Sequence, residues 1–287
     1  MPEGDTIRRL AERINRRFAG ECCQRCVTRD PRLVGVDLAG RVLLGADAVG
    51  KHLLVRFDDG RTLHAHLRMT GSFVVGPAPI EAAWRRRIEL WMETGRLTGL
   101  DVPILGMVAT SREDSVVGHL GPDLCGPEPP DVDDIVARLT DRPDEPLAGA
   151  LLDQRNVAGF GNLYAVEVPF IAGVAPHQPV GAISGLDALV GLGTGLIRTN
   201  AARGPQNTTG RRMQLDDHFV YGRRRRPCPI CATPLDGCDE RSSPWRRVSV
   251  WCPSCQQLAP ERAVDVTRAR RLLALHPARR EPTFPTA

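Results

Sequence analysis

Two pairs of cysteines constrain this chain more than any other feature. Cys228 and Cys231 form one C-x2-C pair, Cys252 and Cys255 form another, and twenty residues separate the pairs. Two tight turns of this kind bring four thiolates to the corners of a tetrahedron, which is the geometry that zinc prefers. Because protein would fill all four positions, no place is left for water. The spacing predicts one structural Zn²⁺ in a ribbon over residues 220–258.

The other five cysteines show no such arrangement. The first three fall on an expected strand after the first helix, and Cys23 and Cys26 could form half of a metal site, but no second pair matches them. We expect buried or half-buried thiols. These residues are Cys22, Cys23, Cys26, Cys125 and Cys238.

Composition restricts the class of protein. The net charge of +4 permits an anionic polymer as partner without requiring one. No uninterrupted apolar run of membrane-spanning length is present, and the acidic residues Glu3 and Asp5 are unlike a secretory signal. We therefore expect a cytoplasmic protein without a membrane partner.

Lysine is nearly absent from the chain. Lys51 is one lysine among 38 lysine and arginine residues. An ammonium retained at one place indicates a need for a compact point charge there, although chance retention is the alternative.

The N-terminal part has the pattern of a β-sandwich flanked by one helix. Apolar spacing predicts an amphipathic helix over residues 6–18, and Asp59-Gly60 is a hairpin turn signal. We assign residues 1–127 to this domain. The predicted strands include Val42–Leu44, Lys51–Phe57, Thr62–Leu67, Ile88–Trp91, Arg96–Leu100 and Gly106–Ala109.

A segment rich in proline and glycine, residues 121–130, predicts a domain boundary, and the apolar spacing beyond it is helical. We expect a helical domain over residues 128–219, the zinc ribbon, and a partly disordered tail over residues 259–287. The fold class is α+β and multi-domain. The predicted helices, all short, are Asp133–Leu139, Leu147–Val157, Leu163–Phe170, Leu186–Thr199 and, in the tail, Val264–Leu275.

The start of the chain could carry covalent chemistry. If Met1 is removed, Pro2 presents a secondary amine; an α-amino group titrates near pH ~8, so part of it is neutral and nucleophilic at physiological pH. Glu3 then offers a proton donor beside it. The alternative is a frayed terminus without a role, which an isolated Pro-Glu-Gly sequence favours.

A glycine-bearing turn, Gln154–Tyr164, separates two predicted helices. Asn162 is expected to cap the second helix, whose N-terminus offers backbone N–H groups to an anion. Arg247 is expected on the strand that enters the second cysteine pair, from which its guanidinium could reach a phosphate. The run Arg223–Arg226 reads as a solvated loop that raises the local positive potential.

Five motifs, in order, resemble those of the formamidopyrimidine-DNA glycosylase and endonuclease VIII family, from Met1 to about Gln257. The resemblance implies a bifunctional DNA glycosylase and abasic-site lyase that acts on double-stranded DNA containing damaged bases or abasic sites. Such a protein is expected to be a monomer and to be nucleoid-associated when bound to DNA. The motifs are Pro2-Glu3-Gly4, Gly50–Leu54, His66–Gly71, Gln154–Tyr164, and Val220–Arg223 leading into the four cysteines with Arg247, Trp251 and Gln256.

The resemblance also implies catalytic roles. Pro2 would attack C1′ of the damaged nucleotide and form a Schiff base, and Glu3 would donate and shuttle protons. Lys51 would contact the phosphate beside the lesion and support β- and δ-elimination.

Further residues would bind DNA if the resemblance holds. His66, Asn162 and Arg247 would hold phosphates near the flipped nucleotide, so that binding weakens with salt. Met69 would fill the space that the flipped base leaves. As a methionine on a strand, Met69 could equally belong to the core.

Two departures from the family pattern bear on the substrate. Asp5-Thr6 stands where the family commonly has proline and a second glutamate, and residues 97–106 lack the Pro-Arg-Arg-Phe-Gly-like loop of the purine-directed branch. The second departure, with Gly4 after Glu3, favours the endonuclease VIII-like branch and oxidised pyrimidines.

Two alternatives remain open on sequence grounds. A catalytically silent lesion-binding protein would bind damaged DNA in a salt-sensitive way without cutting it. A zinc-ribbon regulator would prefer particular sequences in undamaged DNA and would tolerate a blocked N-terminus.

Overall fold

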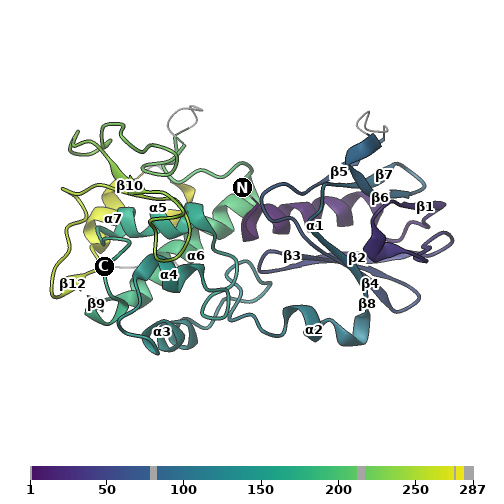
Figure 1. Cartoon of the computed structure of the whole chain (residues 1–287), viewed down its shortest axis with the longest axis horizontal. Coiled ribbons are helices and arrows are strands. Elements are labelled where there is room, and N and C mark those ends of the chain that lie inside the picture. Colours follow the sequence, from purple (N-terminus) through teal and green to yellow (C-terminus); the bar gives the residue numbers. More distant parts are fainter. Residues whose placement is uncertain (1, 78–82, 212–216, 275, 281–287) are drawn as a thin grey trace. The chain divides into compact units, whose positions relative to one another are not determined.

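The computed structural model describes residues 2–77, 83–211, 217–274 and 276–280 (Figure 1). The chain divides into two compact units, one up to His119 and one from Leu120 onward, each with its own hydrophobic core. Among the described residues, no helix has the length and apolar character needed to cross a membrane.

The first unit holds one long helix, α1 (Gly4–Phe18), and two four-stranded antiparallel sheets, as predicted for a β-sandwich with a flanking helix. One sheet has the order β1-β6-β7-β5 and the other β2-β3-β4-β8. The strands are β1 (Arg25–Thr28), β2 (Leu43–Val49), β3 (His52–Phe57), β4 (Arg61–His66), β5 (Ser72–Gly76), β6 (Arg86–Trp91), β7 (Arg96–Leu100) and β8 (Ile104–Ala109). Short helices are η1 (Pro31–Leu33), η2 (Ala83–Arg85), η3 (Thr110–Arg112) and α2 (Asp114–Val117).

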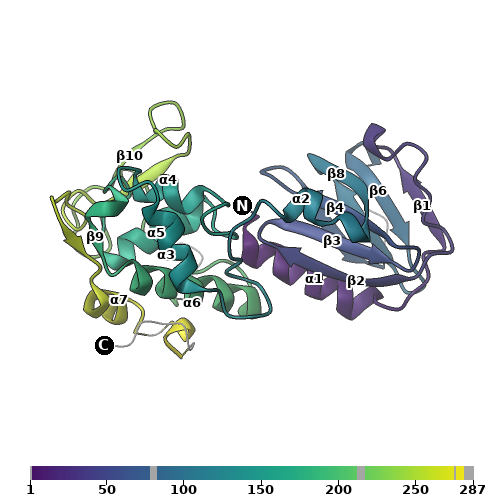
Figure 2. The same cartoon turned by 90° about the horizontal axis from the view of Figure 1, so that it is seen from below.

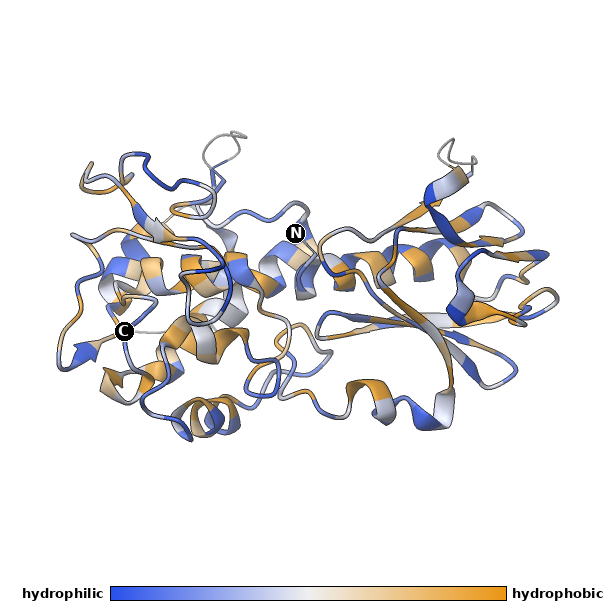
Figure 3. Ribbon diagram, viewed as in Figure 1, coloured by the Kyte–Doolittle hydropathy of each residue, from blue (hydrophilic) through white to orange (hydrophobic). Residues whose placement is uncertain are grey.

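Helix α1 packs against β2 and β3 through the apolar face that its sequence predicts (Figures 2 and 3). The side-chain amide of Asn15 bonds both backbone groups of Ala46: Nδ2 donates to the carbonyl at 2.8 Å, and Oδ1 accepts from the N–H at 2.6 Å. These two bonds anchor the C-terminal part of the helix to β2. The buried apolar residues include Ile7, Leu10, Ile14 and Phe18.

Two details of the first unit differ from the predictions. Strand β2 continues to Val49 instead of ending at Leu44, because a shift of register at Gly45 lets its pairing with β3 resume. Of the three clustered cysteines, Cys26 lies on β1, whereas Cys22 and Cys23 precede that strand. Cys23 is fully buried, and burial raises the pKa of its thiol to about 12, so it is an inert core residue.

The second unit is mainly helical, as predicted. Helix α6 extends to Arg203 and has 18 residues, so the expectation of short helices is wrong here. Glycines on this helix allow close packing: a Cβ at Gly193 would lie 2.3 Å from the Phe160 ring. The main helices are α3 (Val132–Thr140), α4 (Leu147–Leu152), α5 (Asn162–Ala172), α6 (Leu186–Arg203) and α7 (Val266–Leu272), with η4 (Val180–Ala182) and η5 (Pro277–Arg280).

Short strands complete the second unit. Strands β10 (Asp236–Cys238) and β11 (Ser249–Trp251) form an antiparallel pair, the expected ribbon. Strand β12 (Arg262–Ala263) pairs in parallel with β9 (Ile183–Ser184).

The described part of the tail packs against α5. The Arg262 guanidinium donates two hydrogen bonds to the Gly173 carbonyl, and Arg268 lies over the Phe170 ring. The tail helix, α7, ends at Leu272. The predicted end of that helix, Leu275, and residues 281–287 lie outside the described residues.

Candidate functional site

Glu3 lies where α1 begins, directly after the half-buried Pro2. Its side chain is fully buried, and its carbonyl accepts hydrogen bonds from the N–H groups of Thr6 and Ile7. Asp5 in the first turn is also fully buried, and its Oδ1 accepts from the Thr6 N–H at 2.7 Å. A helix N-terminus favours negative charge, which suits both carboxyl groups. This terminus is built into the fold and is not frayed.

Lys51 lies in the two-residue turn that joins β2 to β3. The flanking residues Val49 and His52 are paired in the sheet. Gly50 has a φ of +56° and Lys51 has a negative φ, the pattern of a type II′ hairpin turn. Glycine before the lysine is therefore a requirement of the turn, which fixes where Lys51 leaves the sheet.

His66 ends β4, and a tight turn follows it. The Gly71 N–H donates to the Leu67 carbonyl at 2.8 Å, and a Cβ at Gly71 would lie only 2.8 Å from that oxygen. Met69 lies in this turn, not on a strand, and its side chain is 67% exposed. The alternative of a core methionine is therefore wrong.

The electrostatic surroundings of His66 keep its imidazole neutral. Burial, and then the positive charges of Arg68 and Lys51, lower the pKa of His66 to about 4. The first unit thus brings two cationic side chains and a neutral imidazole together near the exposed Met69.

The prediction that Asn162 caps α5 is wrong. Asn162 is the first residue of this helix, and Gly161 occupies the cap position. The Asn162 side chain instead reaches the ribbon, because its Nδ2 donates to the Val248 carbonyl at 2.8 Å. Nδ2 has a second hydrogen to offer another acceptor. The bond ties the start of α5 to the segment that enters β11.

Arg247 is the neighbour of Val248, so the Asn162 contact brings these two candidate residues together within the second unit. Arg247 is exposed and lies two residues before β11. It was expected on this strand but lies in the bend that precedes it. Its Nη1 donates to the Arg246 carbonyl at 2.9 Å.

The glutamine that begins the glycine-bearing turn holds that turn together. Gln154 donates from Nε2 to the carbonyls of Leu152 and Phe160, and its Oε1 accepts from the Gly159 N–H. Gly159 has a φ of +108°, which only glycine adopts easily.

Glu167 is an important residue that the sequence analysis did not single out. It is fully buried in α5, and its carboxylate accepts from the backbone N–H groups of Phe219, Val220 and Tyr221 and from the Thr208 hydroxyl. The chain entering the ribbon is thereby fixed to α5. In the sequence, the sign of this role is an acidic residue inside an otherwise apolar helix.

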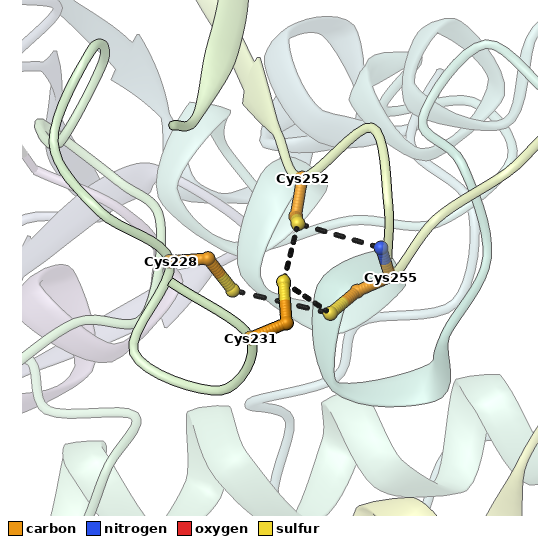
Figure 4. Close-up of side chains that lie close together, drawn as sticks. All are labelled: Cys228, Cys231, Cys252 and Cys255. Atoms are coloured by element: carbon orange, nitrogen blue, oxygen red, sulfur yellow. Dashed lines mark hydrogen bonds between the residues drawn. The ribbon is translucent and has the colours of Figure 1, made fainter. Parts of the chain in front are cut away.

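The cysteines of the two C-x2-C pairs converge as predicted (Figure 4). Their Sγ atoms all lie within 4.8 Å of one another; Cys231 is 3.5 Å from Cys252 and from Cys255, and Cys228 is 3.9 Å from Cys255. Four thiolates bound to one ion at ~2.3 Å in a tetrahedron stand about 3.8 Å apart, so the cluster fits a closed metal site.

Within the described ranges, no other group of three or more histidine, cysteine or acidic side chains is close enough to hold a metal. The three clustered cysteines of the first unit, Cys22, Cys23 and Cys26, therefore do not form a second site.

Comparison with known proteins places the chain among its relatives. The model of the formamidopyrimidine-DNA glycosylase N-terminal domain matches residues 1–106. A probable endonuclease 8 2 of Streptomyces coelicolor is 41% identical over 267 residues, covering 89% of this chain and 94% of the relative. The DNA-(apurinic or apyrimidinic site) lyase Nei2 of Mycolicibacterium smegmatis is 37% identical over 258 residues, covering 89% and 99%.

A solved structure has the same fold. The crystal structure of Lactococcus lactis formamidopyrimidine-DNA glycosylase, non-covalently bound to DNA containing an abasic site, aligns with a TM-score of 0.76 at 22% identity, covering 89% of this chain and 99% of that one. Together with the sequence relatives, this establishes that the chain belongs to the formamidopyrimidine-DNA glycosylase and endonuclease VIII family.

Proposed function

We propose that this protein is a bifunctional DNA glycosylase and abasic-site lyase of base-excision repair. The observation that carries the proposal is the start of α1, where the fully buried Glu3 directly follows Pro2 in a chain 41% identical to a probable endonuclease 8. Its substrate is double-stranded DNA with damaged bases or abasic sites, and it acts as a monomer.

The reaction begins at the N-terminal amine, after removal of Met1. The Pro2 nitrogen attacks C1′ of the damaged nucleotide, the bond from C1′ to the base breaks, and Glu3 supplies protons to the departing groups. The resulting Schiff base acidifies the sugar C2′–H, and successive β- and δ-elimination cleave the strand. Lys51, fixed in its hairpin turn, contacts the adjacent phosphate.

The remaining candidate residues bind the DNA. His66 donates a hydrogen bond to a phosphate, and the Arg247 guanidinium binds a phosphate through two hydrogen bonds. Asn162 donates the amide hydrogen that is not bonded to Val248. The exposed Met69 enters the stack in place of the flipped base. Salt weakens this binding because each neutralised phosphate releases counterions.

The metal of the cysteine cluster is zinc with a structural role. Four cysteine ligands suit Zn²⁺, and a site closed by protein leaves no position for water or substrate. The ligands are Cys228, Cys231, Cys252 and Cys255. Bound zinc would cross-link the two C-x2-C turns and take no part in the reaction. The ribbon thereby presents Arg247 on a rigid turn.

The preferred substrates are oxidised pyrimidines. The segment Leu97–Gly106 forms β7, a short connection and the start of β8, and Val102 in that connection is only 1% exposed. The support for this preference is the absence of a Pro-Arg-Arg-Phe-Gly-like loop from residues 97–106, where the chain instead makes a short connection between two strands. We assign the protein to the cytoplasm, at the chromosome.

Borohydride trapping tests the proposal. Reduction of the Schiff base links protein and DNA covalently, so the protein with a free Pro2 amine, verified by intact mass, is expected to be trapped on abasic DNA. A variant with an uncleaved N-terminal extension carries an amide at Pro2 and is expected not to be trapped, whereas a C-terminal tag should have no effect. Arg247→Ala should weaken DNA binding and still allow trapping at high DNA concentration. Trapping through a blocked N-terminus would overturn the assignment of Pro2.

A further inference from the structure

Three histidines lie on one face of the β3–β4 pair, next to Lys51. His52 is opposite His66 in the antiparallel register, and His64 is two residues before His66, so all three side chains share a face. The opposite face carries Leu53, Leu63 and other core residues. Nothing in the motifs assigns a role to His52 or His64.

His52 and His64 are joined directly. His52 Nδ1 lies 2.8 Å from His64 Nε2, and the two rings meet edge to edge, with centroids 5.0 Å apart and planes 10° apart. One nitrogen must donate and the other accept, so the pair cannot consist of two imidazolium ions. His64 is only 7% exposed and provides a fixed base for the pair.

The His52 ring also contacts His66. Their centroids are 4.9 Å apart and the planes are nearly perpendicular, at 85°. The contact runs from the buried His64, through His52, to the residue that the proposed function places at a phosphate. A fourth ring, His119, touches His52 from outside, with centroids 6.0 Å apart.

The tautomer of His66 follows from a backbone contact. His66 Nδ1 accepts a hydrogen bond from the Arg68 N–H at 3.1 Å, so the proton of the neutral ring is on Nε2. Nε2–H is then the one donor that this ring can offer to a phosphate oxygen.

The charges around the cluster favour neutral rings. Arg68 and Lys51 are the cations that act on it, and the neighbouring imidazoles are His64 and His119. Burial, then the rings of His66, His64 and His119, and then the charge of Arg68 lower the pKa of His52 to about 3. Burial lowers the pKa of His64. A charged ring at position 52 would repel Arg68.

We infer that His52 and His64 are positioning residues for DNA binding: their hydrogen-bonded pair holds the His66 imidazole in the orientation in which Nε2–H meets a DNA phosphate beside Lys51. This inference rests on the proposed function. The pair acts through His66 and does not itself touch DNA or the reacting sugar.

A metal site is the competing interpretation of clustered histidines. In the part of the chain that the structure describes, only the four cysteines approach closely enough to hold an ion. Titration of the full-length protein with Zn²⁺ or Ni²⁺ should therefore leave the three imidazole ring signals unchanged in NMR, and metal-dependent shifts of all three would overturn the inference.

Two variants of His52 separate ring packing from hydrogen bonding. His52→Asn places an amide near the position of Nδ1 and can keep the bond to His64, whereas His52→Phe keeps the ring and loses the bond. The Arg68 N–H meets His66 Nδ1 only while the His66 ring is held in this orientation. In ¹⁵N NMR of the free protein, His66 should therefore be the Nε2–H tautomer in the wild type and a tautomer mixture in both variants. His52→Asn removes the ring that contacts His66, and His52→Phe loses the bond that holds that ring to His64. An unchanged His66 in His52→Phe would refute the positioning role even if the protein had no enzymatic activity.

The DNA-binding test is a double-mutant cycle on abasic-site duplex DNA. His66→Gln and His52→Phe are each expected to weaken binding about tenfold, and the double variant no more than His66→Gln alone, because His52 acts through His66. The trapping rate at saturating DNA should stay unchanged in His52→Phe. Leu44→Ala, at an exposed position on β2, is the control. Additive losses would refute the coupling, whereas absence of trapping in the wild type would count against the proposed function alone.

Discussion

The two units hold their candidate residues by contacts of very different range. In the first unit, a two-residue turn fixes Lys51, and a bond between Leu67 and Gly71 closes the turn that exposes Met69. In the second, Asn162 is held by a carbonyl 86 positions away. A local turn can be altered with little effect on the core around it, whereas a long-range contact is part of the folding of the whole unit. Substitutions at the long-range contacts of the second unit should therefore change stability, and those in the turns of the first unit should change function.

The largest effect is expected from loss of a cysteine of the cluster. Structural zinc contributes about 10–16 kcal/mol in small zinc domains, so Cys252→Ser, at a fully buried position, should release the metal and unfold the ribbon. Metal content and hydrogen exchange measure this, and the first unit should keep its protection. Cys238→Ser, on β10 outside the cluster, should retain the metal. A Cys252→Ser protein with full metal content would contradict the assignment.

Glu167→Gln should give the next largest effect. Glutamine offers one acceptor oxygen and turns its amide N–H₂ toward groups that are themselves donors, which costs about 3 kcal/mol when buried. Urea unfolding of the second unit measures the loss. Glu240→Gln, at an exposed position, is the control and should change little. Equal stability of the two variants would show that the Glu167 bonds are not important for the fold.

Acid should destabilise the first unit through its histidines. The pKa of His52 is lowered to about 3 and that of His66 to about 4, so the unfolded chain binds more protons once the pH falls below about 6.5. Stability is complete above that pH and declines as the pH falls toward 4, by roughly 1 kcal/mol per histidine at pH 5 after allowance for solvent. Hydrogen exchange at pH 7 and pH 5 measures it. His52→Phe, which cannot titrate there, should reduce the slope; an unchanged slope would exclude His52 as a contributor.

Met69→Ala should have the smallest effect on stability and a clear effect on function. Because the side chain is 67% exposed, the free energy of unfolding should change by no more than about 0.5 kcal/mol. Base excision from duplex DNA should slow, since nothing then fills the vacated stack, while cleavage of single-stranded abasic DNA should change less. Leu44→Ala, 60% exposed on β2, is the matched control. Equal excision rates for the two variants would remove Met69 from the DNA interface.

Sequence patterns predicted the structure best where the physical cause of a feature is local. Cysteine spacing predicted the four-thiol cluster because short knuckles bring their own ligands together. Apolar periodicity predicted α1 because one helix face must be buried. The same reasoning placed Met69 on a strand and Asn162 at a helix cap, and both predictions were wrong. The chain turns between Leu67 and Gly71, which puts Met69 in a turn. Gly161 takes the cap position, and the Asn162 side chain reaches Val248, which is distant in sequence.

The sequence by itself determined the four-cysteine cluster, the amphipathic first helix and the family motifs, since each depends on spacing within a short stretch of chain. Only the tertiary structure decided that Glu167 fixes the chain entering the ribbon, that Asn162 reaches Val248, and that His52, His64 and His66 form one connected set. The physical reason is that hydrogen bonds and ring contacts depend on which strands and helices become neighbours, and no local pattern encodes that choice.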